Sequence, residues 1–216
     1  MEIQTPKWHS VVYPYELHLT VNYGSSEHFK ELCEVLGVKP LLIEMQLKNG
    51  GTAEDLMCSF KQETTYEHII NKTKSLAKSF RHLGYKVIRT KIETAPWHPV
   101  SPQKEFDDSH KDMYFEAHIG VILPKGISSL SWEHKILDKW GKLLNVHKST
   151  NVFKEETDHV IQMFTIRDHK SRVSFDRTLA AYQAVLSVAG FKTERVISEF
   201  AIYDSNISHD AEWIGE

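Results

Sequence analysis

A seven-residue pattern occurs twice, one hundred residues apart, and constrains the fold more than any other feature of the sequence. Residues 15–21 and 115–121 share the order aromatic, Glu, apolar, His, aliphatic, variable, Val. In a strand, Glu and His two residues apart share one face, and the aromatic and aliphatic residues share the other. The pattern therefore predicts two half-buried strands at corresponding points of two similar halves.

Hydrophobic spacing predicts the same order of elements in both halves. A serine of the turn Gly24-Ser25-Ser26-Glu27 is placed to cap a helix whose apolar stripe begins at Phe29, and Asn49-Gly50 suits a hairpin turn between two strands. The predicted elements are strands at 13–22, 41–47, 55–62 and 86–93 with helices around 29–36 and 64–83, then strands at 114–122, near 151, at 160–167 and 192–203 with helices around 136–144 and 171–189. Each half reads β-α-β-β-α-β.

A single offset of 106 residues aligns the later parts of the two halves. The same offset aligns a strand, a helix and a further strand. The first strands are offset by 100 residues, and a longer loop in the second half accounts for the difference. The matched pairs include Met57 with Met163, Ser59 with Thr165, Lys61 with Arg167, Gly84 with Gly190, Arg89 with Arg195, and Glu93 with Glu199. We interpret this register as an internal duplication.

The expected fold is α+β, with two ferredoxin-like lobes whose antiparallel sheets form a groove or barrel between them. Pro96, Pro99 and Pro102 mark a linker, because a proline-rich and charged stretch has few residues for a core. The predicted organisation is a first lobe at 1–94, a linker at 95–112, a second lobe at 113–206 and a C-terminal tail at 207–216.

The strand alternation divides each sheet into an apolar face and a polar face. The apolar face of the first lobe should pack against the helices, and it carries Leu17, Leu19, Val21, Leu56, Cys58, Phe60, Ile88 and Ile92. The polar faces, which we expect to line the space between the lobes, carry Glu16, His18, Thr20, Met57, Ser59, Lys61, Arg89, Lys91 and Glu93 in the first lobe and Glu116, His118, Met163, Thr165, Arg167, Arg195 and Glu199 in the second.

Composition narrows the classes of partner. The formal net charge is -3, so no basic surplus points to duplex DNA or to an anionic membrane. No run of about 18 apolar residues and no signal peptide is visible, so the expectation is a cytoplasmic protein. Cys33 and Cys58 lie inside apolar patterns and are expected to be buried free thiols.

The paired histidines suggest acid–base chemistry. His18 and His118 approaching one substrate from opposite lobes could act as base and acid, because an imidazole titrates close to neutral pH. Hydroxyls and cations on the same faces are donors able to hold a phosphoryl group. The candidate catalytic residues are His18, His118 and Thr20, and the candidate substrate-binding residues are Ser59, Lys61, Thr165, Arg167, Arg89 and Arg195.

The tripeptide His18-Leu19-Thr20 in a two-lobed chain resembles the two-histidine phosphoesterases, the superfamily that includes RNA-end cyclic phosphodiesterases. The resemblance implies metal-independent phosphoester chemistry on a phosphorylated small molecule or an RNA end, with each histidine acting as acid or base and each hydroxyl binding phosphate. His118 matches, but Gly120 stands where the second hydroxyl belongs, so Thr165 or Arg167 would have to replace it. The segments 114–118 and 203–206 also look like a family of proteins without an assigned activity.

Three other interpretations remain open. Glu16, His18, Glu116 and His118 are ligand types that hold zinc, manganese or iron, which would make the protein a metal-dependent enzyme. The carboxylates could instead form structural ion pairs across strands: Glu16 and Glu116 with nearby lysine or arginine, and Glu93 and Glu199 with Arg89 and Arg195. A duplicated α+β chain could also be a non-catalytic binding or assembly module, because fold alone does not decide function.

Overall fold

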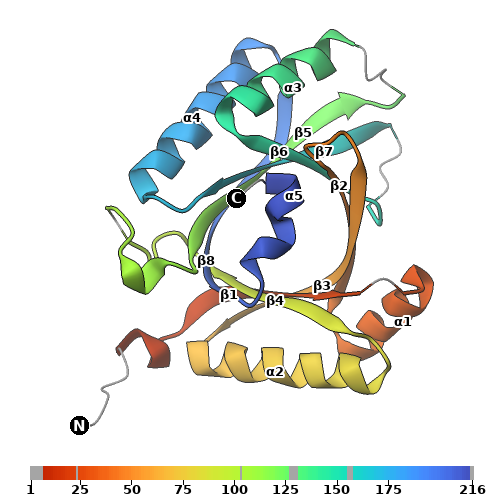
Figure 1. Ribbon diagram of the computed structural model, residues 1–216, viewed down its shortest axis with the longest axis vertical. Coiled ribbons are helices and arrows are strands. Elements are labelled where there is room, and N and C mark those ends of the chain that lie inside the picture. The colour runs from red at the N-terminus through yellow and green to blue at the C-terminus, as the bar shows by residue number, and fades with distance from the viewer. Residues whose placement is uncertain (1–6, 23, 103, 127–130, 155–157, 215–216) are drawn as a thin grey trace.

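The computed structural model describes residues 7–214 apart from 23, 103, 127–130 and 155–157, and these residues form a closed antiparallel β-barrel with its long helices on the outside (Figure 1). The first half contains β1 (Tyr13–Val21), α1 (Ser26–Leu36), β2 (Lys39–Gln46), β3 (Thr52–Thr64), α2 (Tyr66–His82) and β4 (Val87–Thr94). The second half contains β5 (Tyr114–Pro124), α3 (Trp132–Leu144), β6 (Val146–Asn151), β7 (His159–Asp168), α4 (Arg172–Val188) and β8 (Lys192–Asp204). The predicted α+β class and element order are confirmed.

The strand order shows how the two halves close the barrel. It runs β1-β3-β2-β6-β7-β5-β8-β4, so in each half the first strand lies between the third and the fourth, as in a ferredoxin-like unit. The halves meet where β2 pairs with β6 and where β4 pairs with β8. Of the predicted alternatives, groove or barrel, the structure has a barrel.

Strand pairing gives the two halves the same register. Glu16 lies opposite Lys61 and Glu93 in the first half, and Glu116 lies opposite Arg167 and Glu199 in the second. A register shift also follows the same position of each first strand, between residues 20 and 21 and between residues 120 and 121. Residues that the offsets of 100 and 106 align in the sequence therefore occupy equivalent places in the two halves of the barrel. A common origin by duplication stays a prediction.

Each long helix begins at a capped residue. Ser25, Thr65, Ser131 and Ser171 are the N-caps of α1, α2, α3 and α4, and each side-chain oxygen accepts a hydrogen bond from a backbone N–H three residues further on. Gly37 ends α1 in the left-handed conformation with φ of 66°, which glycine adopts without steric cost. These local signals fix where the outer helices begin and hence how they cover the strands.

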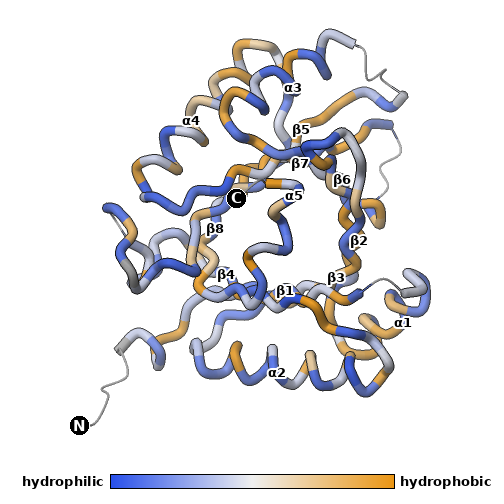
Figure 2. Tube along the Cα trace, in the orientation of Figure 1, coloured by the Kyte–Doolittle hydropathy of each residue, from blue (hydrophilic) through white to orange (hydrophobic). Residues whose placement is uncertain are grey.

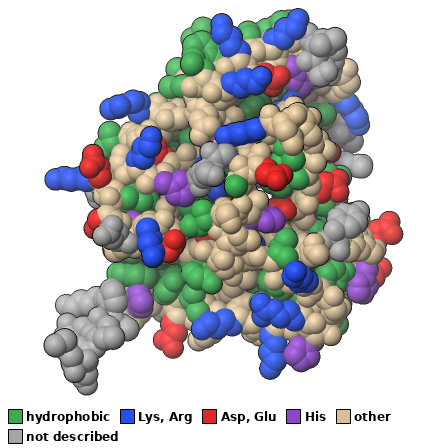
Figure 3. All heavy atoms as spheres, viewed as in Figure 1, with side chains coloured by type: hydrophobic (Ala, Val, Ile, Leu, Met, Phe, Trp, Pro, Cys, Tyr) green, Lys and Arg blue, Asp and Glu red, His purple; other side chains and the backbone are tan. Residues whose placement is uncertain are grey.

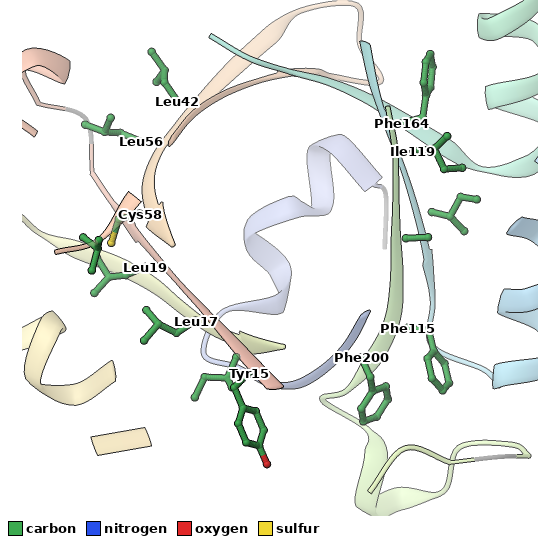
Figure 4. Close-up of a cluster of buried hydrophobic side chains, with 14 of the residues drawn as sticks. Tyr15, Leu17, Leu19, Leu42, Leu56, Cys58, Phe115, Ile119, Phe164 and Phe200 are labelled. Carbon is green, nitrogen blue, oxygen red and sulfur yellow. The ribbon is translucent and has the colours of Figure 1, made fainter. Parts of the chain in front are cut away.

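The hydrophobic core lies between the outside of the barrel and the helices. Hydrophilic and hydrophobic residues alternate along the strands in Figure 2, and the apolar side chains labelled in Figure 4 point away from the centre of the barrel. Leu17, Leu19 and Cys58 are fully buried in this layer, and Cys33 is buried there as a free thiol like Cys58. Of the predicted apolar face, Phe60 and Ile88 are only half-buried. The polar alternate positions are left to face the barrel interior.

The segment that follows β8 enters one end of the barrel. A 3-10 helix (Ile207–Asp210) and the short α5 (Ala211–Ile214) lie across the ring of strands in Figure 1. Trp213 Nε1 donates to the carbonyl of Lys148 at 3.1 Å, and Trp213 and Ile214 form a buried cluster with Met45. The sequence suggested a tail at 207–216. Its described part, up to Ile214, is instead packed against the barrel, and 215–216 lie outside the described residues.

The predicted linker at 95–112 connects β4 to β5 along the outside of the molecule. Glu105 forms an isolated antiparallel bridge with Ser171, and Phe106 packs against Phe115 and Phe200. Although its composition is polar, this stretch is therefore anchored to the second lobe.

The surface gives no sign of a single-charge patch on the face shown in Figure 3, where Lys and Arg side chains are interspersed with Asp and Glu. Among the described residues, no helix combines the length and the apolar character that crossing a membrane requires.

Candidate functional site

The barrel interior holds a cavity of about 230 Å³. Each sequence-predicted site residue contributes to its wall: His18, His118, Thr20, Ser59, Lys61, Thr165, Arg167, Arg89 and Arg195. They come from β1, β3 and β4 of one lobe and β5, β7 and β8 of the other. The barrel thus brings both histidines to one hollow, as the two polar strand faces predicted.

Two His–Glu pairs lie at equivalent positions inside the barrel. His18 Nε2 lies 2.8 Å from Glu93 Oε2. His118 and Glu199 are the equivalent pair of the second lobe, and one nitrogen or carboxylate oxygen each of His118, Glu199 and the first-lobe Glu93 lie within 4.8 Å of one another. Because Glu93 approaches both histidines, the two pairs form one cluster rather than two separate sites. We call His18, Glu93, His118 and Glu199 the central cluster.

Glu93 is the ionised carboxylate of the central cluster. Its side chain is fully buried, which by itself would raise its pKa, but the ammonium group of Lys91 at 2.7 Å and the hydrogen bond to His18 lower the pKa to about 2. A buried carboxylate that is held charged in this way can orient an imidazole and stabilise positive charge on it.

Glu199 is the protonated carboxyl group. Burial, followed by the negative charges of Glu93 and Glu16, raises its pKa to about 9, and Lys61 at 3.8 Å offsets only part of this effect. Its side chain is 14% exposed and reaches the cavity. At neutral pH this carboxyl therefore keeps a proton next to the ionised Glu93.

One substitution between the lobes explains why the two glutamates differ. Lys91 lies opposite His18 on β4, and Ile197 lies opposite His118 on β8, so the two residues are equivalent. Lys91 places a positive charge 2.7 Å from Glu93, whereas Ile197 adds none beside Glu199, whose ion-pair distance to Lys61 is 3.8 Å. The lobes are alike in backbone but opposite in the protonation of their central carboxyl groups.

His118 is held in its neutral form. Burial lowers its pKa more than the surrounding carboxylates raise it, and Lys91 also lowers it. Its Nδ1 lies 3.0 Å from the hydroxyl of Thr165 on the paired strand. A neutral imidazole between Glu93 and Glu199 can accept a proton from one side and donate one to the other.

Most of the cations expected to hold phosphate are occupied by carboxylates of the protein. Arg89 donates to Asp204 at 2.6 Å and to Asp210 at 2.9 Å. Arg167 donates to Glu116 at 3.1 Å and to Asp210 at 2.7 Å. Lys61 forms an ion pair with Glu16 and lies 3.8 Å from Glu199. Among the described residues, Arg195 has one ion pair, with the neighbouring Glu194 at 3.9 Å.

The metal-site interpretation named Glu16, His18, Glu116 and His118, and the structure does not group these four. Glu116 is engaged by Arg167 and by Lys91 at 2.9 Å. In the described chain, the groups close enough to surround an ion are Glu93, His118 and Glu199, and Asp55, His209 and Asp210. The ammonium group of Lys91 already balances the first group, and His209 bonds both Asp55 oxygens at 2.9 Å in the second.

Sequence reasoning missed parts of this site. Glu93 and Glu199 were paired in the register but were regarded as partners of arginine in inter-strand ion pairs. The 106-residue offset also pairs Lys91 with Ile197, and this mismatch was the available signal for the different carboxyl groups. Asp210 and Trp213, which line the cavity from the C-terminal segment, had no counterpart in the repeat.

A second hollow opens at the end of the barrel away from α5. Its lining joins Pro14, Gln62, Thr94, Trp97 and Ser198 to four residues that also line the cavity, namely Glu16, Lys61, Ile197 and Glu199. These shared residues make it the mouth through which a ligand would reach the central cluster.

Comparison with known proteins leaves the family open. No family model matches the sequence, and no curated protein matches it. Similar solved structures include a provisionally named monooxygenase from Fusobacterium nucleatum (11% identity, 89% of this chain and 92% of that chain, TM-score 0.31), a provisionally named chlorite dismutase (11%, 88% and 94%, TM-score 0.29) and a dye-decolorizing protein from V. cholerae (10%, 88% and 94%, TM-score 0.28). Likeness at this level says nothing of activity.

Proposed function

We propose that the protein is an enzyme that transfers protons to and from a small organic substrate bound inside the barrel. The observation that carries this proposal is the split between Glu93, whose pKa is lowered to about 2, and Glu199, whose pKa is raised to about 9. When their surroundings give two carboxyl groups very different pKa values, one can be protonated and the other ionised at the same pH. A site can in this way hold an acid and a base together.

In this mechanism His18 with Glu93 is the base. The carboxylate of Glu93, 2.8 Å from Nε2, favours the tautomer that carries its proton on Nε2, so Nδ1 has the lone pair. Nδ1 is buried and has no hydrogen-bond partner in the described protein. When Nδ1 takes a proton from the substrate, the negative charge of Glu93 stabilises the resulting imidazolium.

Glu199 is the acid, and His118 passes protons to it. The protonated carboxyl donates its proton to the atom of the substrate that gains negative charge. Neutral His118 restores that proton by releasing one from one ring nitrogen while it takes up one from water at the other, so the ring stays neutral, and His18 releases the proton that it abstracted to water. Thr165 positions this ring through its contact with Nδ1. No metal or redox cofactor takes part in these steps.

The remaining cavity wall indicates the kind of substrate. Alongside the polar cluster it is lined by Leu41, Ile43, Met57, Met163 and Ile197. Its volume is below the roughly 300–1,000 Å³ typical of sites for drug-sized ligands. A substrate with a short apolar portion and one reactive polar group fits these surroundings.

Phosphoester hydrolysis or transfer is the second candidate, as the resemblance to two-histidine phosphoesterases implied. One contact favours it: the hydroxyl of Thr165 lies 3.0 Å from His118, on the strand paired with Gly120, and so supplies the hydroxyl that the second motif lacks. A phosphorylated ligand or RNA end would then lie between Thr20 and Thr165. Arg89 and Arg167 would have to exchange carboxylate partners for phosphate.

Substrate screening with matched variants tests the proposal. Rate against pH should be bell-shaped, and His18→Ala, His118→Ala and Glu199→Gln should each reduce kcat/KM by about 100-fold or more. His68→Ala changes an exposed imidazole on α2 and should have full activity. Full activity in His18→Ala or His118→Ala refutes the acid–base pair, and turnover restricted to phosphoesters favours the second candidate.

A further inference from the structure

At the end of the barrel covered by α5, a carboxylate of the chain itself binds between two arginines. Asp210 Oδ2 accepts from Arg89 Nη1 at 2.9 Å and from Arg167 Nη2 at 2.7 Å. Arg89 belongs to β4 of the first lobe and Arg167 to β7 of the second, and all three side chains are buried. The contacts of Asp210 thus show that one carboxylate inside this barrel can accept hydrogen bonds from an arginine of each lobe.

The other end of the barrel carries the equivalent pair of cations. Arg195 lies opposite Gly120 as Arg89 lies opposite Thr20, and Lys61 lies opposite Glu16 as Arg167 lies opposite Glu116. Both Arg195 and Lys61 line the cavity. The register therefore places a second pair of cations, again one from each lobe, at the opposite end of the barrel, where Lys61 also lines the mouth.

At this end Lys61 contacts Glu16, as Arg167 contacts Glu116 at the closed end, but among the described residues no carboxylate bridges Lys61 and Arg195 as Asp210 bridges Arg167 and Arg89. The segment after β4 is the counterpart of the segment after β8 that carries Asp210. Unlike that segment, it leaves the barrel. Its His98 is fully buried and lies 3.0 Å from the hydroxyl of Tyr15, whose ring belongs to the outer core layer. The mouth stays open between Lys61 and Trp97.

The charges around Arg195 leave it able to bind an anion. Its side chain is 44% exposed, and its one ion pair among the described residues is the 3.9 Å contact with Glu194. Arg89, in the equivalent position, bonds both Asp204 and Asp210. Glu199 next to Lys61 is uncharged at neutral pH, so it does not repel an incoming anion and can donate a hydrogen bond to it.

We propose that the cavity, at its end next to the mouth, binds a carboxylate group of the substrate between Lys61 and Arg195, as the closed end binds Asp210 between Arg167 and Arg89. The substrate class is a small organic acid. Its apolar part lies along Ile197 and Met163, and its reactive atom reaches the central cluster. This assignment deepens the proposed function, but binding can be measured without turnover.

Titration of the full chain with three probes of similar shape tests the carboxylate assignment. Benzoate should bind about tenfold or more tightly than neutral benzamide, because a charge-assisted hydrogen bond is lost in the amide. Benzoate should also shift the side-chain Nε–Hε signal of Arg195 in a nitrogen-15 NMR spectrum. Phenyl phosphate is the third probe, and binding at least tenfold tighter than that of benzoate overturns the carboxylate assignment in favour of phosphate.

Matched variants locate the site. Arg195→Gln should weaken benzoate binding by about tenfold, whereas Arg177→Gln, an exposed arginine on α4, should leave it unchanged. Equal binding of benzoate and benzamide, or unchanged binding of benzoate to Arg195→Gln, overturns the proposal. If benzoate binds through Arg195 but no organic acid is turned over, the binding site stands and the proposed catalytic function fails.

Discussion

Lys91 and Ile197 occupy equivalent positions in the two lobes, each opposite a central histidine, and only Lys91 carries a charge. Lys91 Nζ lies 2.7 Å from Glu93 and 2.9 Å from Glu116, so this one ammonium group compensates carboxylates of both lobes. Ile197 provides Glu199 with no such partner. A nearly symmetric barrel thereby acquires one charged and one protonated carboxyl group at its centre.

Changing Ile197 to lysine should make the two lobes alike. The new ammonium group would stabilise the carboxylate of Glu199 and so lower its pKa from about 9 toward the ordinary range. In Ile197→Lys the infrared band of a protonated carboxylic acid should disappear at pH 7, and kcat/KM should fall by about 100-fold if Glu199 is the acid.

Ile197→Met is the matched control, because it changes the shape of the side chain without adding charge. It should keep the protonated-acid band and most of the activity. If the band persists in Ile197→Lys, the residue at this position does not decide the protonation of Glu199.

The stability of the protein should fall as pH rises through the neutral range, because of Glu199. The unfolded carboxyl releases its proton near pH 4.5 and the folded one near 9, so between these values the folded state binds the extra proton. The free energy of unfolding should then decrease by up to about 1.4 kcal/mol per pH unit from this group. Glu199→Gln lacks the titration, so its stability relative to the wild type should rise between about pH 5 and 8 in urea unfolding. A difference independent of pH would contradict this.

Asp210 should be important for stability because two buried arginines depend on it. Asp210→Asn leaves Arg89 and Arg167 short of a negative charge, and breaking a buried ion pair in this way typically costs about 3–5 kcal/mol. The control is Asp176→Asn, which removes an exposed ion pair with Arg172 on α4 and should cost no more than about 0.5 kcal/mol. Chemical unfolding of both variants measures the difference, and equal costs would show that Asp210 is not a structural anchor.

We expect the central cluster to work without a metal ion, because Lys91 already supplies positive charge beside Glu93. Protein purified without added metal should contain less than one equivalent by elemental analysis, and a chelator should change neither its melting temperature nor its activity. One tightly bound equivalent, with a melting temperature that falls after chelation, would favour the metal-dependent alternative instead.

The sequence predicted the fold well because its signals were periodic and repeated. Alternation in residues 15–21 and 115–121 fixed which side chains face inward, and the 106-residue offset aligned the later strands. Helix ends followed local chemistry at Ser25 and Gly37. All of these are properties of neighbouring residues or of the repeat, which can be read without knowing the packing.

The candidate site was predicted less completely because it depends on contacts between distant segments. The burial of Glu93 and its contact with His18 arise from strand pairing, and the pairing of Arg89 and Arg167 with Asp210 arises from a C-terminal segment that the repeat does not contain. Residue types identified the cations as candidates to bind phosphate. Only the folded chain shows that carboxylates of the protein occupy most of them.

The central claim is that Glu93 and Glu199 hold opposite protonation states at neutral pH. Carbon-13 NMR of selectively labelled glutamate side chains, titrated over the pH range in which the protein stays folded, measures both carboxyl groups, and Glu93→Gln and Glu199→Gln assign the signals. Glu199 should titrate with a midpoint near 9, and Glu93 should stay ionised down to about pH 2. Two carboxyl groups that both titrate near 4.5 would contradict it.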